Sequence, residues 1–287
     1  MAVVPIKQSG ESVSAVNFAA RSVIYAILTV VCVVTLVPIV WLVAATTKRP
    51  DEVLSVSYPF FSPHPTLQNF VDLFAKVPFV RYFMNSAFIT CATVITQLFF
   101  SSLGGFALAK YEFKGKGFIV GLMIATMMIP GTITLAPSYE LMFRLGLIDT
   151  YQGLIIPGAV SVFGMFLFRQ AIQAVPDELI HAARIDGCTE FGIYWNVVMP
   201  VVRPMIGAFC LMTFMGTWNG FLWPQILLHS QERFTLPIAL NQMIGLYNNE
   251  YGMLMAGTLL SVLPVVVLFF ALQKEFVAGL TTGAVKG

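Results

Sequence analysis

Residues 22–47 read SVIYAILTVVCVVTLVPIVWLVAATT, a stretch without a single Asp, Glu, Lys or Arg. A helix that crosses the hydrocarbon core of a bilayer needs about 20 predominantly apolar residues. A charged side chain at the centre of such a helix costs roughly 2.5–3.5 kcal/mol on insertion scales. The length and the missing charges together predict that this stretch is a membrane-spanning helix.

The same pattern returns along the whole chain. Only 10% of the 287 residues are charged, against roughly 25% in soluble domains, and the mean hydropathy is +0.82. The charge-free runs are 22–47, 82–109, 117–139, 150–168, 204–231 and 251–273. We therefore predict an all-α polytopic membrane protein with six transmembrane helices and both termini on one side.

The distribution of Lys and Arg gives the expected orientation. With both termini in the cytoplasm, the inner segments hold more Lys and Arg than the outer ones, and the short basic loop 110–116 is the clearest case. We expect a membrane domain over 22–273, with cytoplasmic tails at 1–21 and 274–287. Its outer loops are then 48–81, 140–149 and 232–250, and 169–203 is an inner loop. The first apolar run is too long for the core of a signal peptide, so we expect an uncleaved anchor.

Several kinds of chemistry have no basis in this sequence. The chain has no phosphate-binding loop, its three His are not at metal-ligand spacing, and no carboxylate lies within a span to relay protons or sodium ions. The net charge of +2 does not favour nucleic acid, and the four Cys form no disulfide pattern. We therefore expect no catalytic residue, metal or cofactor on this chain, and uphill transport would need energy from another subunit.

The inner segment reads VPDELIHAARIDGCTEFGIYWNVVMPVVRP over 175–204 and is unusually polar for this chain. Pro176 suits the first position of a helix, two acidic residues follow it, and Gly187 suits a left-handed cap. A second helix is predicted over 189–199, with Pro200 ending it. Asp177, His181 and Arg184 would share a polar face. Such a helix pair either presents a docking surface or rests on lipid headgroups.

The order and spacing of this segment resemble the EAA loop of ABC-importer permeases. The matching positions are 178–179, 182–187, Phe191 and Pro200, whereas His181 stands where the family usually has Glu. The resemblance implies a type I ABC-importer permease-like bundle, in which this loop is a coupling helix that fits a cleft on the ATPase. The residues implied to couple are Glu178, His181, Ala182, Ala183, Asp186 and Gly187.

Further fragments are similar to the maltose-type carbohydrate importers. They lie at 66–70, 85–86, 106–116, 128–130, 145–151 and 276–287. The resemblance implies a heterodimer with a second permease subunit, two ATPase subunits that bind Mg-ATP, an extracytoplasmic solute-binding protein and a sugar substrate. It also implies alternating access in a bacterial cytoplasmic (inner) membrane, with substrate held mostly by the other permease. The tail residues implied to reach the ATPase are Gly283, Lys286 and Gly287.

Two further sets of residues are candidates for contact with the substrate or the binding protein. Sugars stack on aromatic rings and bond to amides, which makes Trp218, Asn219 and Trp223 pathway candidates. An interfacial aromatic belt and a packing Asn would explain the same residues. The candidates for contact with the binding protein are Tyr247, Asn248, Asn249 and Glu250.

Other functions stay open on sequence grounds. A permease of the same architecture could import a glycerol phosphate or phosphodiester, although the spans contain no Arg or Lys to bind an anion. A channel or secondary carrier would work without an ATPase, although a carrier usually needs buried ionisable groups. An intramembrane enzyme has no visible site.

Overall fold

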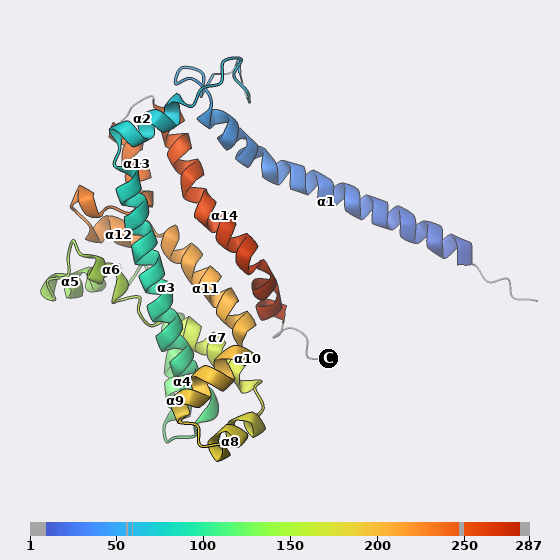
Figure 1. Cartoon of the computed structure of the whole chain (residues 1–287), viewed down its shortest axis with the longest axis vertical. Helices are drawn as coiled ribbons and strands as arrows, with labels where there is room; N and C mark the ends of the chain where they lie inside the picture. The colour runs from blue at the N-terminus through green and yellow to red at the C-terminus, as the bar shows by residue number, and fades with distance from the viewer. Residues whose placement is uncertain (1–9, 56, 59, 247–249, 282–287) are drawn as a thin grey trace, which may run out of the picture. The chain divides into compact units, whose positions relative to one another are not determined.

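Helices are the only regular elements among the residues that the computed structural model describes, which are 10–55, 57–58, 60–246 and 250–281 (Figure 1). The long helices are α1 (Gly10–Thr46), α3 (Phe79–Lys110) and α14 (Tyr251–Thr281). Those before the polar inner segment are α2 (Gln68–Lys76), α4 (Lys116–Met127), α5 (Leu135–Arg144), α6 (Tyr151–Ile155) and α7 (Val162–Gln173). Within and after it lie α8 (Asp177–Ile185), α9 (Glu190–Ile193), the π-helical turn η1 (Tyr194–Val198), α10 (Met199–Val201), α11 (Arg203–Trp218), α12 (Leu222–Leu227), the 3-10 turn η2 (Gln231–Arg233) and α13 (Leu236–Leu246).

Three of the six predicted spans are single long helices. Ala20–Thr46, Phe79–Lys110 and Tyr251–Val277 are each long and apolar enough to cross a membrane, which confirms the first, second and sixth predictions. A fourth candidate is the pair Glu190–Val201 and Arg203–Trp218, bent by 84°. The all-α, polytopic class is therefore confirmed.

The predicted spans 117–139 and 150–168 are wrong as uninterrupted helices. The first is divided into α4 and α5 by turns around Pro130, and the second into α6 and α7 by turns after Pro157. A proline removes a backbone donor and disfavours the helical conformation of the residue before it, which explains both breaks. Likewise the span predicted over 204–231 ends at Trp218 and resumes as α12.

Two regions outside the predicted spans are helical. The predicted outer loop 232–250 contains α13, and α1 begins at Gly10, inside the predicted tail 1–21. Adding residues to an existing helix is far less costly than nucleating one, so the polar residues before the first span continue its helix.

Contacts divide the chain into two compact units, Met1–Asp72 with Asn249–Leu259 and Leu73–Asn248 with Leu260–Gly287. In the first unit, polar groups cap the end of α1. The side-chain amide of Asn69 donates to the carbonyls of Thr46 at 2.8 Å and Lys48 at 2.7 Å. The fully buried Lys48 ammonium donates to the carbonyl of Tyr58 at 2.6 Å. The bond to Thr46 satisfies a carbonyl that the end of α1 leaves without a partner, and the other two hold the chain that follows the helix.

The second unit is built around α3, which packs against α7 and α11 (Figure 1). Small residues allow the close approach of α3 and α7. A Cβ atom added at Gly105 would lie 2.6 Å from the Cβ of Phe168 and 2.9 Å from the backbone nitrogen of Arg169. Ser101 adds a polar contact, because its Oγ lies 3.2 Å from both the backbone nitrogen and the carbonyl oxygen of Ser161.

Gly105→Val should separate α3 from α7. The added side chain meets the backbone of α7, which cannot rotate away, so we expect a loss of roughly 1–3 kcal/mol. The measurement is the thermal midpoint of the detergent-solubilised protein. Gly121→Val in α4 is the control, because no atom lies within 4 Å of its added Cβ. Equal midpoints for the two variants would contradict this account of the packing.

Candidate functional site

The polar segment forms α8 much as its sequence predicts. Asp177 and Glu178 occupy its first turn, and Gly187 ends it with a left-handed backbone at φ +81°, which confirms the predicted cap. The backbone N–H of Cys188 donates to the carbonyl of Ala183 at 3.0 Å and closes the turn. Pro176 is the residue before the helix rather than its first residue.

α8 has one buried and one exposed face. Ile180 and Ala183 are 3% and 7% exposed and point into the protein. Glu178, His181, Ala182 and Ile185 are exposed at the i, i+3, i+4, i+7 spacing of one face. Ile185, in contrast to Ile180, is 87% exposed. Of the two adjacent alanines, only Ala182 is accessible to a partner.

Charged groups tie α8 to the end of α3. The Lys110 ammonium, whose side chain is 6% exposed, donates to the carbonyl of Val175 at 2.5 Å and to the carboxylate of Asp177 at 2.7 Å. Its hydrogen bond lowers the pKa of Asp177. Arg184 binds the carboxylate of Glu190 through two bonds of 2.8 and 3.1 Å, and the hydroxyl of Tyr111 donates to the same carboxylate.

A buried core rich in aromatic residues connects α8 to α3. Tyr194 is 1% exposed, its hydroxyl lies 2.7 Å from the Oγ of Ser102 in α3, and its ring packs against Phe106 and Phe191. The buried cluster comprises Phe106, Phe168, Ile172, Val175, Ile180, Ala183, Ile193, Tyr194, Val198, Met199, Val202 and Phe209. Movement of α8 must therefore displace or repack this core.

The helix predicted over 189–199 is confirmed at its start and wrong at its end. The hydroxyl of Thr189 accepts from the backbone N–H of Gly192 at 3.1 Å and caps α9. The chain then forms the π-helical turn η1 and continues through Pro200 in α10. The break falls instead at Val202, directly before α11, and the 84° bend lies there. Such π-helical turns are rare and often occur at functional sites.

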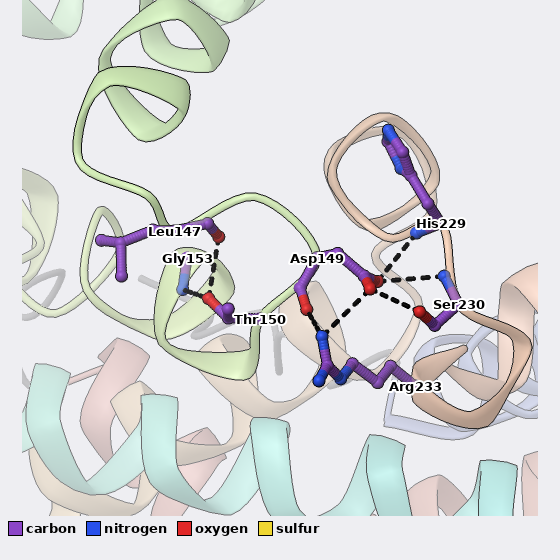
Figure 2. Close-up of polar contacts among 7 residues, drawn as sticks. All are labelled: Leu147, Asp149, Thr150, Gly153, His229, Ser230 and Arg233. Carbon is purple, nitrogen blue, oxygen red and sulfur yellow. Dashed lines mark hydrogen bonds and ion pairs between the residues drawn. The ribbon is translucent and has the colours of Figure 1, made fainter.

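A polar corner joins residues 147–153 to residues 228–233 (Figure 2). The Asp149 carboxylate accepts from the backbone N–H groups of His229 at 2.9 Å and Ser230 at 3.0 Å, from the Ser230 hydroxyl, and from Arg233 at 3.0 Å. Burial raises the pKa of Asp149, but these bonds and the Arg233 charge outweigh it and lower the pKa to about 2. Sequence reasoning gave Asp149 no role.

Residues 232–236 are also hydrogen-bonded to α3. The Asn85 amide donates to the carbonyls of Glu232 and Phe234, both at 2.9 Å, and its oxygen accepts from the hydroxyl of Tyr151 at 2.8 Å. The Oγ of Ser86 accepts from the backbone N–H of Leu236 at 2.7 Å. The chain from 228 to 236 is therefore held from two sides.

A cavity of about 210 Å³ lies beside this stretch, between α3, the α6–α7 connection, α11 and α12, and Thr235 is part of its lining. Of the pathway candidates, Trp223 lines it. Trp218 is instead a packing residue, because it is 4% exposed, stacks on Phe214 and donates to the carbonyl of Ser261 at 2.9 Å. Asn219 is exposed and donates to the carbonyl of Met215 in its own helix.

Some predicted residues are not placed. Tyr247, Asn248 and Asn249 lie outside the described residues, as do the tail residues Gly283, Lys286 and Gly287. Glu250 is described, and its carbonyl accepts from the backbone N–H of Met253 at 3.1 Å in the first turn of α14. Within the described part of the chain, no group of His, Cys, Asp and Glu could hold a metal ion.

Asp149→Asn should destabilise the protein in a pH-dependent manner. The Asp149 side chain is 22% exposed, and a shift from 3.8 to about 2 corresponds to about 2 kcal/mol. Because the folded-state pKa is lowered, this stabilisation is complete above the unfolded-state pKa and is lost as the pH falls through 2. The gap in thermal midpoint between wild type and variant should therefore be widest near neutral pH and narrower at pH 3.

Glu140→Gln is the control for Asp149→Asn. It removes only an exposed i, i+4 pair with Arg144, which is worth little. A gap for Asp149→Asn that stays constant between pH 7 and pH 3 would contradict the assigned pKa.

The chain is similar to a known protein family and to several named relatives. The family model described as "Binding-protein-dependent transport system inner membrane component" matches residues 101–281. The chain is 39% identical over 253 residues to the arabinooligosaccharides transport system permease protein AraQ of Halalkalibacterium halodurans, covering 87% of this chain and 91% of that protein. It is 32% identical over 262 residues to the lactose transport system permease protein LacG of Rhizobium radiobacter, covering 91% and 95%.

A solved structure shares the fold. It is that of a bacterial ABC transporter involved in the import of the acidic polysaccharide alginate, with a TM-score of 0.80 and 22% identity. The match covers 95% of this chain and 100% of the other.

Proposed function

Because the chain belongs to the family of inner membrane components of binding-protein-dependent transport systems, we propose that it is the permease subunit of an ATP-driven importer of a sugar or oligosaccharide. The single observation that carries the sugar assignment is the similarity along almost the whole chain to permeases named for arabinooligosaccharide and lactose transport. The cavity agrees with a neutral substrate, since none of the described residues that line it is Asp, Glu, Lys or Arg. An imported phosphate ester would call for a basic residue there.

The exposed face of α8 is the surface proposed to receive energy from a separate ATPase subunit that binds Mg-ATP. Its members are Glu178, His181, Ala182, Ile185 and Asp186. Among the described residues, Glu178 and Asp186 have no ion-pair partner, so they are available to a basic groove. Ile185, an aliphatic side chain that is 87% exposed, lies on the same face. Ala183 acts from the inner side, by packing α8 onto the aromatic core.

The remaining partners follow from this assignment. We place α8 and both termini in the cytoplasm and the corner at Asp149 on the outer face, where an extracytoplasmic solute-binding protein docks. A second permease subunit completes the pathway, and two ATPase subunits bind below. ATP-driven closure of the ATPase pair moves α8, and the bundle changes between two packings that open to opposite sides.

Uptake by the assembled importer tests the proposed function. The complex is purified through an affinity tag on this chain, reconstituted in liposomes and supplied with its binding protein and labelled arabinotriose or lactose. We expect ATP-dependent uptake of at least one of these sugars and co-purification of an ATPase. Uptake of equal rate without ATP would instead support the channel or carrier alternative.

Gly187→Val should uncouple ATP hydrolysis from transport. No atom lies within 4 Å of an added Cβ at Gly187, so the effect arises from its φ of +81°, which costs a β-branched residue roughly 1–2 kcal/mol or more and displaces the end of α8. Gly187→Asn is the matched control, since Asn tolerates this conformation. We expect the Val variant to keep basal ATPase activity and lose most sugar-stimulated activity and uptake. Unchanged stimulation would disprove the role of α8.

A further inference from the structure

We propose that the cavity beside the 228–236 stretch is a subsite of this chain that binds one neutral sugar ring during transport. This inference rests on the proposed function and extends it, because it assigns direct substrate contact to this subunit. The cavity of about 210 Å³ is smaller than the roughly 300–1,000 Å³ of pockets that enclose a drug-sized ligand. It therefore accepts one ring of a longer chain rather than a whole oligosaccharide.

Two buried hydroxyl groups line this cavity without a partner. Thr93 and Thr235 are 5% and 4% exposed, and the Oγ1 atom of each lacks a hydrogen bond within the described part of the chain. A buried polar group left unsatisfied costs about 1–3 kcal/mol. Thr96, one turn from Thr93, shows how a threonine hydroxyl in a helix is usually satisfied: it donates to the carbonyl of Ala92 at 2.8 Å. In this conformation each Oγ1 is enclosed by protein, so its hydrogen-bonding capacity is left unused until the bundle changes its packing and a ligand reaches it.

The cavity side of α3 carries four polar residues beside the apolar Ile89. Ser86, Thr90, Thr93 and Gln97 follow one another at intervals of four, three and four residues, and all line the cavity. Gln97 contributes an amide that both donates and accepts. Polar residues within a membrane helix are costly and face protein or a water-filled pathway, and Thr93 lies near the middle of α3.

The opposite wall leaves room for a ring. A Cβ added at Gly216 would meet no atom within 4 Å, and at Gly158 its nearest neighbour would be the Gln97 amide at 3.6 Å. Trp223 adds an aromatic surface to the lining. Hydroxyl and amide groups beside an aromatic side chain suit a polyhydroxylated ring, whereas a carboxylate or phosphate would find no compensating charge.

The outer end of the cavity is fixed in shape. Thr235 lies between two anchored residues: Phe234 accepts from Asn85, and Leu236 donates to Ser86. Its backbone therefore holds the hydroxyl in one place before a ligand arrives. Such preorganisation lowers the entropic cost of binding.

The test compares variants of the intact complex in liposomes, with the binding protein and labelled arabinotriose. Thr93→Val and Thr235→Val remove the orphaned hydroxyls at nearly constant volume, and Gly216→Leu fills the cavity. We expect each Val variant to lower the uptake rate roughly three- to tenfold, the double variant more, and Gly216→Leu to abolish most uptake. Thermal midpoints should be unchanged or higher for the Val variants, because an unsatisfied hydroxyl is removed.

Matched controls separate the subsite from general damage. Thr96→Val alters a hydroxyl satisfied within α3, and Gly121→Leu adds the same side chain at another open glycine. Both should keep wild-type uptake. A cryo-EM structure of the sugar-loaded complex should show a ring within hydrogen-bonding distance of Thr93 and Thr235.

Two results would overturn the proposal in distinguishable ways. The subsite is disproved if the wild-type complex takes up sugar and the Val and Leu variants take it up at the same rate. It is also disproved if the cavity of the sugar-loaded complex holds ordered water alone. Either result leaves the importer assignment intact. A wild-type complex that takes up neither arabinotriose nor lactose would overturn the importer assignment, and the subsite with it.

Discussion

The close packing of α3 against α7 is the contact on which both functional regions depend. Because Gly105 has no side chain, the backbone of α7 can approach α3 closely. Ser101 hydrogen-bonds to the backbone of Ser161 at the start of α7. α7 ends at Gln173 and leads directly into α8, so the packing fixes where α8 emerges. The α6–α7 connection lines the cavity at the other end of α7. One helix pair thus positions the coupling surface and the central cavity together.

The two regions are also joined by the chain that follows α8. From α9 the chain passes through the π-helical turn, Pro200 and the 84° bend into α11, and Gly216 near the end of α11 lines the cavity. A rigid helix amplifies a small rotation at one end into a larger displacement at the other. Rotation of α11 about the bend at Val202 would therefore move Gly216 relative to Thr93 on α3. Tyr194, which contacts Ser102 on α3, and Val202 at the bend belong to the same buried cluster.

Features that depend on one stretch of chain could be predicted from the sequence, whereas features that depend on tertiary packing could not. Charge-free length predicted α1, α3 and α14, and Gly187 predicted the end of α8, because each depends on one stretch of chain. The choice between Ala182 and Ala183 as the exposed residue depends on which way α8 turns against the aromatic core. Trp218 and Trp223 are five residues apart, yet one packs against Phe214 and the other lines a cavity.

Other features depended on partners distant in the chain. Asp149 has a positive φ of 56°, and its carboxylate binds residues 80 and more positions away, so no local pattern marks it. The orphaned hydroxyls of Thr93 and Thr235 likewise lie on segments far apart in sequence. Prolines were visible, but whether a proline kinks a membrane helix or divides it is decided by how its neighbours satisfy the freed backbone groups.

The membrane constraint that gives the spans their composition also limits what they can recognise. Lipid excludes charges from the spans, so a binding surface built there has hydroxyls, amides and aromatic rings available and few ions. Such a surface pairs well with neutral hydroxyl groups and badly with a carboxylate, whose burial without a counter-charge is prohibitive. The structure of the alginate importer shares this fold at 22% identity, which carries no information about substrate charge. The described residues that line the cavity include hydroxyls, an amide and Trp223, which are the groups that a membrane span can supply without charge.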